Sequence, residues 1–218
     1  MARFDLVIFD CDGVVVDSER IVFEVFDAFI RSLGVHLTEP ETRERFLGRT
    51  LAACMTIVEQ LSGRPAPLGA LERYMAERDR VLREQVQPVA GIREVLETLT
   101  TPFCIASSGG YDKMRITLGA TALMPFFEGR LFSATEVAHG KPAPDIFLLA
   151  AERMGVDAER TVVIEDTVNG VLAGSAAGMT VLGYVDLTPA AKLVAAGAAA
   201  TFAHMRELPA LLESSYAA

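Results

Sequence analysis

Short runs of consecutive hydrophobic residues recur along the chain and predict strands. The first is Leu-Val-Ile-Phe at residues 6–9. A continuous hydrophobic run of this length is typical of a strand that is buried on both faces of a parallel sheet. Similar runs follow at residues 103–106, 161–164 and 180–183.

Segments with helical spacing of hydrophobic residues lie between these runs. The spacing predicts helices at about residues 113–118, 145–154 and 168–177. Strands and helices that alternate in this way form βαβ units. The pattern therefore predicts an α/β fold with a doubly wound, Rossmann-like parallel sheet.

The interval between the first and second runs has a different pattern. Hydrophobic residues are spaced for helices at residues 21–33, 51–61 and 68–86, and a Gly- and Pro-rich segment at 63–67 separates two of them. We expect no strand between Asp17 and Gln87. The predicted organisation is a core domain of residues 1–15 and 87–218, interrupted by an all-helical domain of residues 16–86.

Charge and composition narrow the class of protein. The 218 residues are 51% hydrophobic and carry a net charge of −9, which argues against a nucleic-acid partner. No hydrophobic run is long enough for a signal peptide or a membrane span, so we expect a cytoplasmic protein without a membrane partner. The three cysteines show no CxxC spacing, which argues against a disulfide framework and a zinc site.

Two acidic pairs follow predicted strands. Asp10 and Asp12 come after the first strand, and Glu165 and Asp166 come after the strand at 161–164. Residues two apart in an extended segment point the same way, so Asp10 and Asp12 can face one pocket. Carboxylates gathered there require a cation, and Mg²⁺ prefers oxygen ligands. All four are candidate metal ligands, although each pair alone also fits an acidic turn or a helix cap.

A hydroxyl-rich turn and one lysine are candidates for binding phosphate. Ser107 and Ser108 follow the strand at 103–106 and precede a helix, where hydroxyl and backbone N–H groups can surround an anion. Lys141 precedes a Pro-Ala-Pro segment that stiffens the backbone and aims the charge. The alternatives are an ordinary Ser-Gly turn and a solvated loop lysine.

The combination of these groups is more informative than any one of them. Each group follows a separate predicted strand, and the carboxyl ends of the strands line the ligand crevice of a doubly wound sheet. The sequence therefore predicts a site for a metal ion and a phosphate group at that edge.

The same residues resemble the signature of a known family. The ordered set Asp10-x-Asp12-Gly13, Ser107, Lys141 within GKPAPD, and Glu165-Asp166 resembles the four motifs of the haloacid dehalogenase superfamily. The helical insert looks like the type 1 cap of that superfamily. In general appearance the chain is similar to the subgroup that holds beta-phosphoglucomutase and the small sugar-phosphate phosphatases.

This resemblance implies a magnesium-dependent phosphatase that acts on a small phosphorylated metabolite. Asp10 would attack phosphorus and form an aspartyl phosphate, and Asp12 would protonate the leaving alcohol and then activate water. Ser107 and Lys141 would bind the transferring phosphoryl group, and the cap would close over the crevice. Mg²⁺ would be held by Asp10, the backbone carbonyl of Asp12, Asp166 and Glu165. We expect a monomer or a weak homodimer.

Departures from the family pattern separate the alternatives. Haloacid dehalogenases proper lack the second aspartate, so Asp12 argues against dehalogenation. A substrate-gripping arginine of beta-phosphoglucomutase is replaced by Leu51, which favours a phosphatase over a mutase. Arg49 and Lys113 are candidate substrate contacts. A phospho-accepting receiver module is the alternative from another class, but a receiver needs neither the insert nor Asp12.

Overall fold

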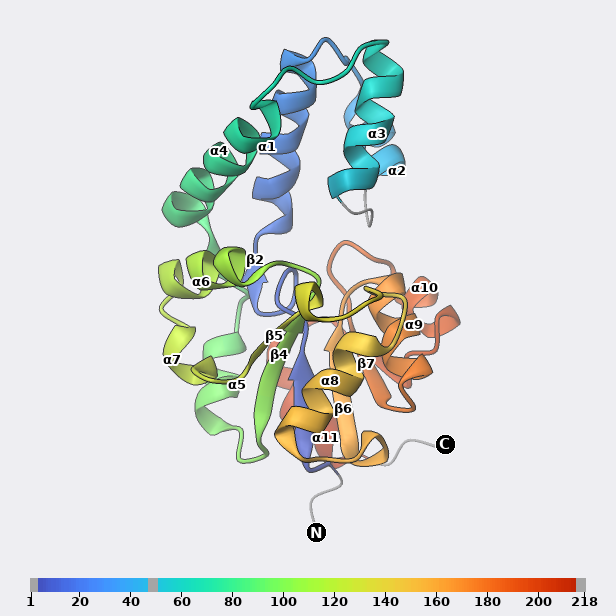
Figure 1. Ribbon diagram of the computed structural model, residues 1–218. Helices are drawn as coiled ribbons and strands as arrows, with labels where there is room; N and C mark the ends of the chain where they lie inside the picture. Colours follow the sequence, from blue (N-terminus) through green and yellow to red (C-terminus); the bar gives the residue numbers. More distant parts are fainter. Residues whose placement is uncertain (1–3, 47–50, 215–218) are drawn as a thin grey trace. The chain divides into compact units, whose positions relative to one another are not determined.

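The computed structural model of the chain describes residues 4–46 and 51–214. These residues divide into two compact units (Figure 1). The core unit comprises the chain up to Asp17 and from Val86 onward, and the helical unit is Ser18–Gln85.

The core unit is built on a six-stranded sheet in the order β5-β4-β1-β6-β7-β8. Every neighbouring pair in it is parallel. The strands are β1 (Leu6–Phe9), β4 (Phe103–Ser107), β5 (Leu131–Ser133), β6 (Thr161–Glu165), β7 (Thr180–Tyr184) and β8 (Ala200–Phe202). The predicted α/β fold with a doubly wound parallel sheet is confirmed.

Alternation along the strands produces two hydrophobic layers. Leu6 and Ile8 of β1 belong to a buried cluster with Phe147 of α8 (Asp145–Met154) and Val171 of α9 (Val168–Ala176). Phe9 points to the other face, where its ring packs edge-on against that of Phe103 at 6.2 Å. Both faces of the strand are therefore covered, which explains its continuous hydrophobic sequence.

The strands and helices predicted for the core are observed at the expected residues. The strands at the two edges of the sheet, however, could not be predicted from the hydrophobic pattern. The short edge strands β5 and β8 were not predicted, because each has only three residues. The other helices of the core unit are α5 (Ile92–Thr98), α6 (Tyr111–Ala120), α7 (Met124–Phe127), α10 (Ala190–Ala195) and α11 (Leu208–Glu213).

A two-stranded antiparallel ladder lies at the ends of the interval that was expected to contain no strand. The interval from Asp17 to Gln87 was expected to contain no strand, yet both end residues are paired. Strand β2 (Val16–Asp17) runs antiparallel to β3 (Gln87–Pro88), with Asp17 opposite Gln87. Two residues are too few for a hydrophobic pattern, so this two-stranded ladder, which lies where the chain leaves and re-enters the core, could not be predicted from the sequence.

The helical unit contains α1 (Glu19–Ser32), α2 (Glu39–Phe46), α3 (Leu51–Ser62) and α4 (Ala70–Gln85). Its centre is aromatic: the Phe26 ring lies 5.1 Å from that of Phe46 and 5.6 Å from that of Tyr74. Helix α2 was not predicted, because its sequence EPETRERF is almost entirely polar. That this unit acts as a cap stays a prediction.

Across the described residues, no helix combines the length and hydrophobicity that a membrane crossing needs.

Candidate active site

The central strands bring the predicted residues to one edge of the sheet. Asp10 follows β1, Ser107 ends β4 and Glu165 ends β6, and β1 lies between the other two. All three strands are parallel, so their carboxyl ends meet at this edge. The side chains of Asp10, Ser107 and Glu165 are all buried.

Lys141 is the centre of the site. Its Nζ donates hydrogen bonds to Asp10 Oδ1 at 2.5 Å, Glu165 Oε1 at 2.7 Å and the Ala106 carbonyl oxygen at 3.1 Å. An ammonium group has three N–H donors, so these contacts satisfy it. Its side chain is only 5% exposed. The lysine therefore joins the ends of β1, β4 and β6 through one buried charge.

The charges around Lys141 do not balance. Burial raises the pKa of Asp10 to about 7; Lys141 opposes this rise, and the nearby carboxylates of Glu165 and Asp12 add to it. Burial alone would lower the pKa of Lys141, but Asp10 and Glu165 outweigh it and hold that pKa above its ordinary value. One cation cannot neutralise several carboxylates, so the acidic groups around Lys141 carry more negative charge than the lysine offsets.

Glu165 is held by four hydrogen bonds, two of them from Thr167, which the sequence analysis did not select. Its Oε2 accepts hydrogen bonds from the Asp166 N–H at 3.0 Å, the Thr167 N–H at 3.0 Å and the Thr167 hydroxyl at 2.9 Å. Its Oε1 accepts the bond from Lys141. Both oxygens of Glu165 are thus bound by the protein, which orients the carboxylate toward the lysine.

Gly170 is a second residue that the sequence analysis left without a role. A Cβ on Gly170 would lie 1.8 Å from Glu165 Oε1, so only glycine lets α9 begin this close to the carboxylate. The Thr167 hydroxyl also accepts a hydrogen bond from the Gly170 N–H at 3.1 Å and caps the helix. A glycine inside a predicted helix was the signal for this close approach.

Asp12 pairs with the second lysine of the site. Lys113 Nζ donates to Asp12 Oδ1 at 2.7 Å, across 101 positions of sequence. The two side chains are 17% and 20% exposed, respectively, so this pair is more open to solvent than Lys141. The structure thus separates the acids of the first motif: Asp10 binds Lys141, and Asp12 binds Lys113.

The two serines differ in their surroundings. Ser107 is buried, and its Oγ accepts a hydrogen bond from the Gly109 N–H at 2.9 Å. Ser108 is exposed. The turn thus holds the Ser107 hydroxyl at the end of β4, while phosphate binding by either serine stays a prediction.

The oxygen-rich turn after β1 fits a hard cation. Asp10 and Asp166 are buried carboxylates at the ends of adjacent strands β1 and β6. A Cβ on Gly13 would lie 2.4 Å from Asp166 Oδ2, so the glycine leaves the space in which this carboxylate approaches the turn. Among residues 4–46 and 51–214, no three His, Cys, Asp or Glu side chains form a metal cluster. A magnesium ion bound by Asp10 and Asp166 would therefore take its other oxygen ligands from outside these side chains, as the expected contribution of the Asp12 backbone carbonyl would.

Only one of the two predicted substrate contacts, Lys113 and Arg49, lies in the part of the chain that the structure describes. Lys113 lies at the site, whereas Arg49 lies outside the described residues, as does the neighbouring Gly48. Leu51 is described and begins α3.

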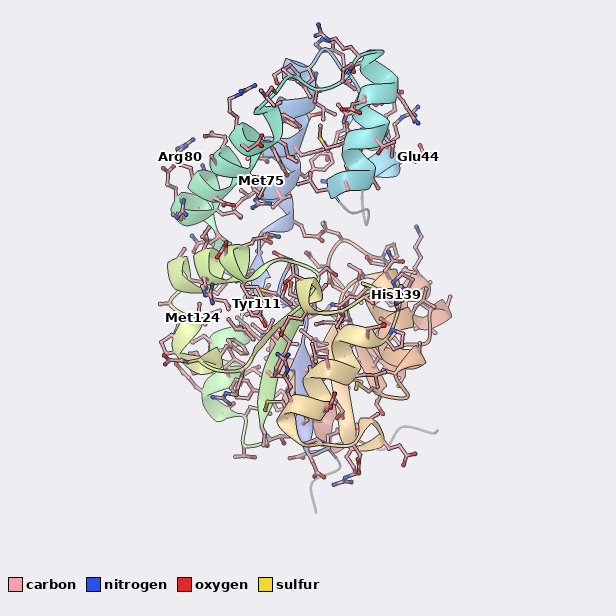
Figure 2. The ribbon with its side chains drawn as sticks, viewed as in Figure 1. Glu44, Met75, Arg80, Tyr111, Met124 and His139 are labelled. Carbon is pink, nitrogen blue, oxygen red and sulfur yellow. The ribbon has the colours of Figure 1, made fainter. Side chains whose placement is uncertain are left out.

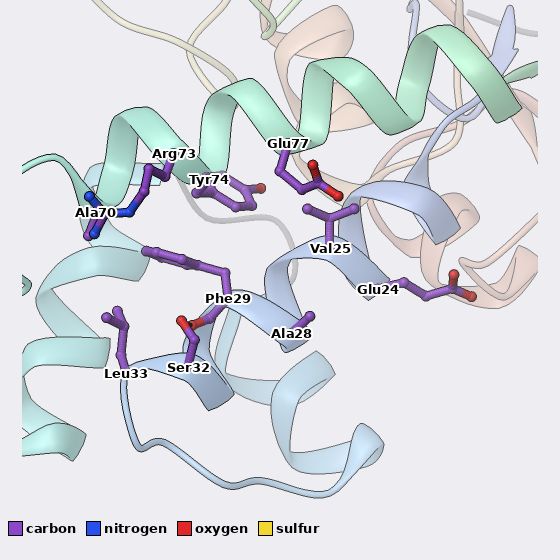
Figure 3. Close-up of a pocket in the computed structure, with 10 residues that line it drawn as sticks. All are labelled: Glu24, Val25, Ala28, Phe29, Ser32, Leu33, Ala70, Arg73, Tyr74 and Glu77. Carbon is purple, nitrogen blue, oxygen red and sulfur yellow. Dashed lines mark hydrogen bonds between the residues drawn. The ribbon is translucent and has the colours of Figure 1, made fainter.

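A hollow of about 430 Å³ lies within the helical unit, between α1 and α4 (Figure 3). Phe29 and Tyr74 form part of its wall, and their ring centroids are 5.0 Å apart. None of the predicted catalytic, phosphate-binding or metal-binding residues lines it, so it does not belong to the site around Asp10.

Comparison with known proteins agrees with this geometry. A family model described as haloacid dehalogenase-like hydrolase matches residues 4–178. The chain belongs to the haloacid dehalogenase-like hydrolases. It is therefore an enzyme, and the sequence-based resemblance to this superfamily is confirmed.

Relatives of this hydrolase match over nearly their whole length. The chain is 32% identical over 212 residues to the 6-phosphogluconate phosphatase of Escherichia coli, covering 97% of this chain and 96% of that protein. A conserved haloacid dehalogenase-like protein of unknown function from Agrobacterium tumefaciens has a TM-score of 0.83, 36% identity, and coverage of 96% and 97%. A family hydrolase from Deinococcus radiodurans, solved with bound phosphate and sodium, has a TM-score of 0.80, 31% identity, and coverage of 97% and 96%.

Proposed function

We propose that this hydrolase is a magnesium-dependent phosphatase of a small phosphorylated sugar, sugar acid or polyol. The observation that carries the proposal is the contact of Lys141 with both Asp10 and Glu165 at the carboxyl ends of β1 and β6. This arrangement places a buried cation beside a buried carboxylate that can act as nucleophile. The names of the relatives support the substrate class: one is a 6-phosphogluconate phosphatase.

In the first step, a carboxylate oxygen of Asp10 attacks the substrate phosphorus. The new bond from oxygen to phosphorus forms as the bond to the leaving alcohol breaks, and Asp12 donates its proton to that alcohol. Lys141 stabilises the charge on the phosphoryl oxygens. The product of this step is an aspartyl phosphate on Asp10 and a free alcohol.

In the second step, Asp12 takes a proton from a water molecule, and the resulting hydroxide attacks the aspartyl phosphate. The bond between Asp10 and phosphorus breaks, inorganic phosphate leaves, and Asp10 is restored as a carboxylate. Asp12 is again protonated and ready to serve as the acid. One residue thus serves as acid and then as base, which is why a second carboxylate beside the nucleophile is useful.

Asp10, the Asp12 carbonyl and Asp166 would hold Mg²⁺. When bound, the ion supplies positive charge to the reacting phosphoryl group and to the carboxylates. The surplus of acidic groups around Lys141 and the space left by Gly13 support this assignment. Glu165 was expected as a further ligand, but its oxygens are bound by Lys141, Thr167 and backbone N–H groups. We therefore assign Glu165 to the positioning of Lys141.

The test is phosphate release with Mg²⁺ across phosphorylated sugars, sugar acids and polyols, with isomerisation of beta-glucose 1-phosphate followed in parallel. We expect many turnovers of release on one subset and none in EDTA. The variant Asp10→Asn should keep the fold and lose turnover. Isomerisation without net release would indicate the mutase, and a single phosphate per chain would indicate the receiver module.

A further inference from the structure

The two lysines of the site differ in how far the protein satisfies them. Lys141 Nζ has three acceptors, Asp10, Glu165 and the Ala106 carbonyl. Lys113 Nζ donates only to Asp12 among the residues that the structure describes. An ammonium group carries three donors, so Lys113 retains N–H groups for a ligand, whereas each N–H group of Lys141 already has an acceptor within the protein when no substrate is bound.

The position of Lys113 is also unfavourable for a structural lysine. It lies in the first turn of α6, where the partial positive charge of the helix terminus disfavours a cation. The start of α6 is held in place by other contacts: the Tyr111 hydroxyl donates to the Glu136 carboxylate (Figure 2 labels Tyr111). The lysine is therefore not needed to anchor this helix.

Gly109 lies next to the ion pair of Asp12 and Lys113. A Cβ on Gly109 would lie 3.6 Å from Asp12 Oδ2 and 3.6 Å from Lys113 Cδ. Gly109 thus lies beside the ion pair, close enough that an added Cβ would make ordinary van der Waals contact with both side chains. The result is a cation held beside Asp12, on an anchored helix, with partial access to solvent.

In the proposed reaction, Asp12 acts on the leaving alcohol, so a cation beside Asp12 lies on the side of the leaving group. We propose that Lys113 is a specificity-determining residue that binds a carboxylate on the leaving group, and so selects phosphorylated sugar acids over neutral sugars and polyols. This assignment rests on the proposed function. Asp12 is the partner of Lys113 in the absence of substrate, and the substrate carboxylate shares the same ammonium group when bound.

A matched pair of substrates tests this role. The compounds 6-phosphogluconate and sorbitol 6-phosphate differ only at carbon 1, which is a carboxylate in the first and a hydroxymethyl group in the second. The readout is the ratio of kcat/KM for the two compounds, because loss of the contact with Asp12 lowers both rates by a common factor. We expect Lys113→Met to lower this ratio by about 10- to 100-fold, the loss of one charge-assisted hydrogen bond.

Two further variants serve as controls. Lys113→Arg keeps the positive charge and should retain most of the preference for 6-phosphogluconate. Lys192→Met removes an exposed lysine of α10 and should leave both rates unchanged. An unchanged ratio in Lys113→Met would overturn the proposal. If both rates fell equally, so that the ratio stayed the same, the lysine would be shown only to position Asp12 or to bind the phosphoryl group.

A binding measurement keeps the test independent of turnover. Calorimetry compares 6-phosphogluconate with sorbitol 6-phosphate on Asp10→Asn and on the double variant with Lys113→Met. We expect the double variant to lose about 10-fold or more of its preference for 6-phosphogluconate. Equal preference in the two proteins would overturn the assignment of Lys113. Absence of turnover in the wild type, with this preference intact, would overturn only the proposed function.

Discussion

At the scale of single residues, the site depends on one buried lysine. Lys141 is 5% exposed, and its charge offsets the carboxylates of Asp10 and Glu165. Removing one partner of a buried ion pair leaves an uncompensated buried charge, which costs far more than the pair contributes.

We predict that Lys141→Met lowers the free energy of unfolding by about 3–5 kcal/mol at about pH 8 in EDTA. The loss should be smaller at about pH 5.5. The pKa of Asp10 is raised to about 7, so this carboxyl takes up its proton as the pH falls and no longer needs the lysine. Urea unfolding of the two proteins at both pH values measures this difference.

The same Lys141→Met change in Asp10→Asn protein tests whether Asp10 and Lys141 are energetically coupled. In Asp10→Asn protein, the same Lys141→Met change should cost less, because one of the two carboxylates is already neutral. An equal cost in both backgrounds, or a loss that grows as the pH falls, would show that Asp10 and Lys141 are not energetically coupled.

The members of the proposed site could be predicted from the sequence, but which acid pairs with which lysine could not. Asp10, Ser107 and Glu165 could be selected because each follows a hydrophobic run, and Lys141 because it precedes a stiff Pro-Ala-Pro segment. Which acid meets which lysine depends on side-chain direction at the strand ends. Glu165 ends β6 and turns to Lys141, and this direction reverses at each residue of a strand. Hydrophobic patterns carry no information on that choice for an acidic pair.

At the scale of elements, the start of α9 fixes the position of Glu165. Thr167 caps this helix and also holds Glu165, and Gly170 lets the turn approach the carboxylate. A glycine in a helix ordinarily reduces stability, so its presence here reflects the close contact.

We predict opposite effects for two Gly→Ala changes in helices. Gly170→Ala should destabilise the protein by more than about 1 kcal/mol and reduce activity, because the new Cβ would overlap Glu165. Gly119→Ala in α6 should stabilise it by about 0.5–1 kcal/mol, because no atom lies within 4 Å of the added Cβ. Urea unfolding and phosphate release measure both. A stabilised, fully active Gly170→Ala protein would contradict this account of the helix.

The elements that sequence analysis missed are short or polar. Strands β5 and β8 have three residues each, and α2 has only Phe46 as a large hydrophobic side chain. Their place is set by neighbours in the fold. Leu131 is paired with Ile105 of β4, and Ala200 with Leu182 of β7. Tertiary contacts therefore decide where the sheet ends.

At the scale of the whole molecule, the proposed metal site would link ion binding to folding. The candidate ligands Asp10 and Asp166 lie more than 150 positions apart and meet only in the folded core, so an ion that binds them stabilises the folded state. The excess negative charge around Lys141 adds to this effect.

We predict that Mg²⁺ raises the free energy of unfolding of the wild type, by about 2.7 kcal/mol at a concentration 100 times its Kd. The increase should largely disappear in Asp166→Asn. The measurement is thermal or urea unfolding with Mg²⁺, with NaCl of equal ionic strength as the control. The same increase in both proteins would mean that Asp166 is not a ligand.

The order of the strands has a consequence for synthesis of the protein. Strand β1 precedes the other strands of the sheet in the chain but lies inside the sheet, between β4 and β6. Its residue Phe9 pairs with Ile105 and Ile164, so neither edge of β1 is complete until much of the chain has been made. Asp10, which follows β1, therefore gains neighbours from both flanking strands only after β6 has been made, more than 150 positions further along the chain. A nascent chain that ends before β6 therefore lacks one strand partner of β1 and the carboxylate of Glu165 that binds Lys141, so the proposed site can assemble only after β6 has been made.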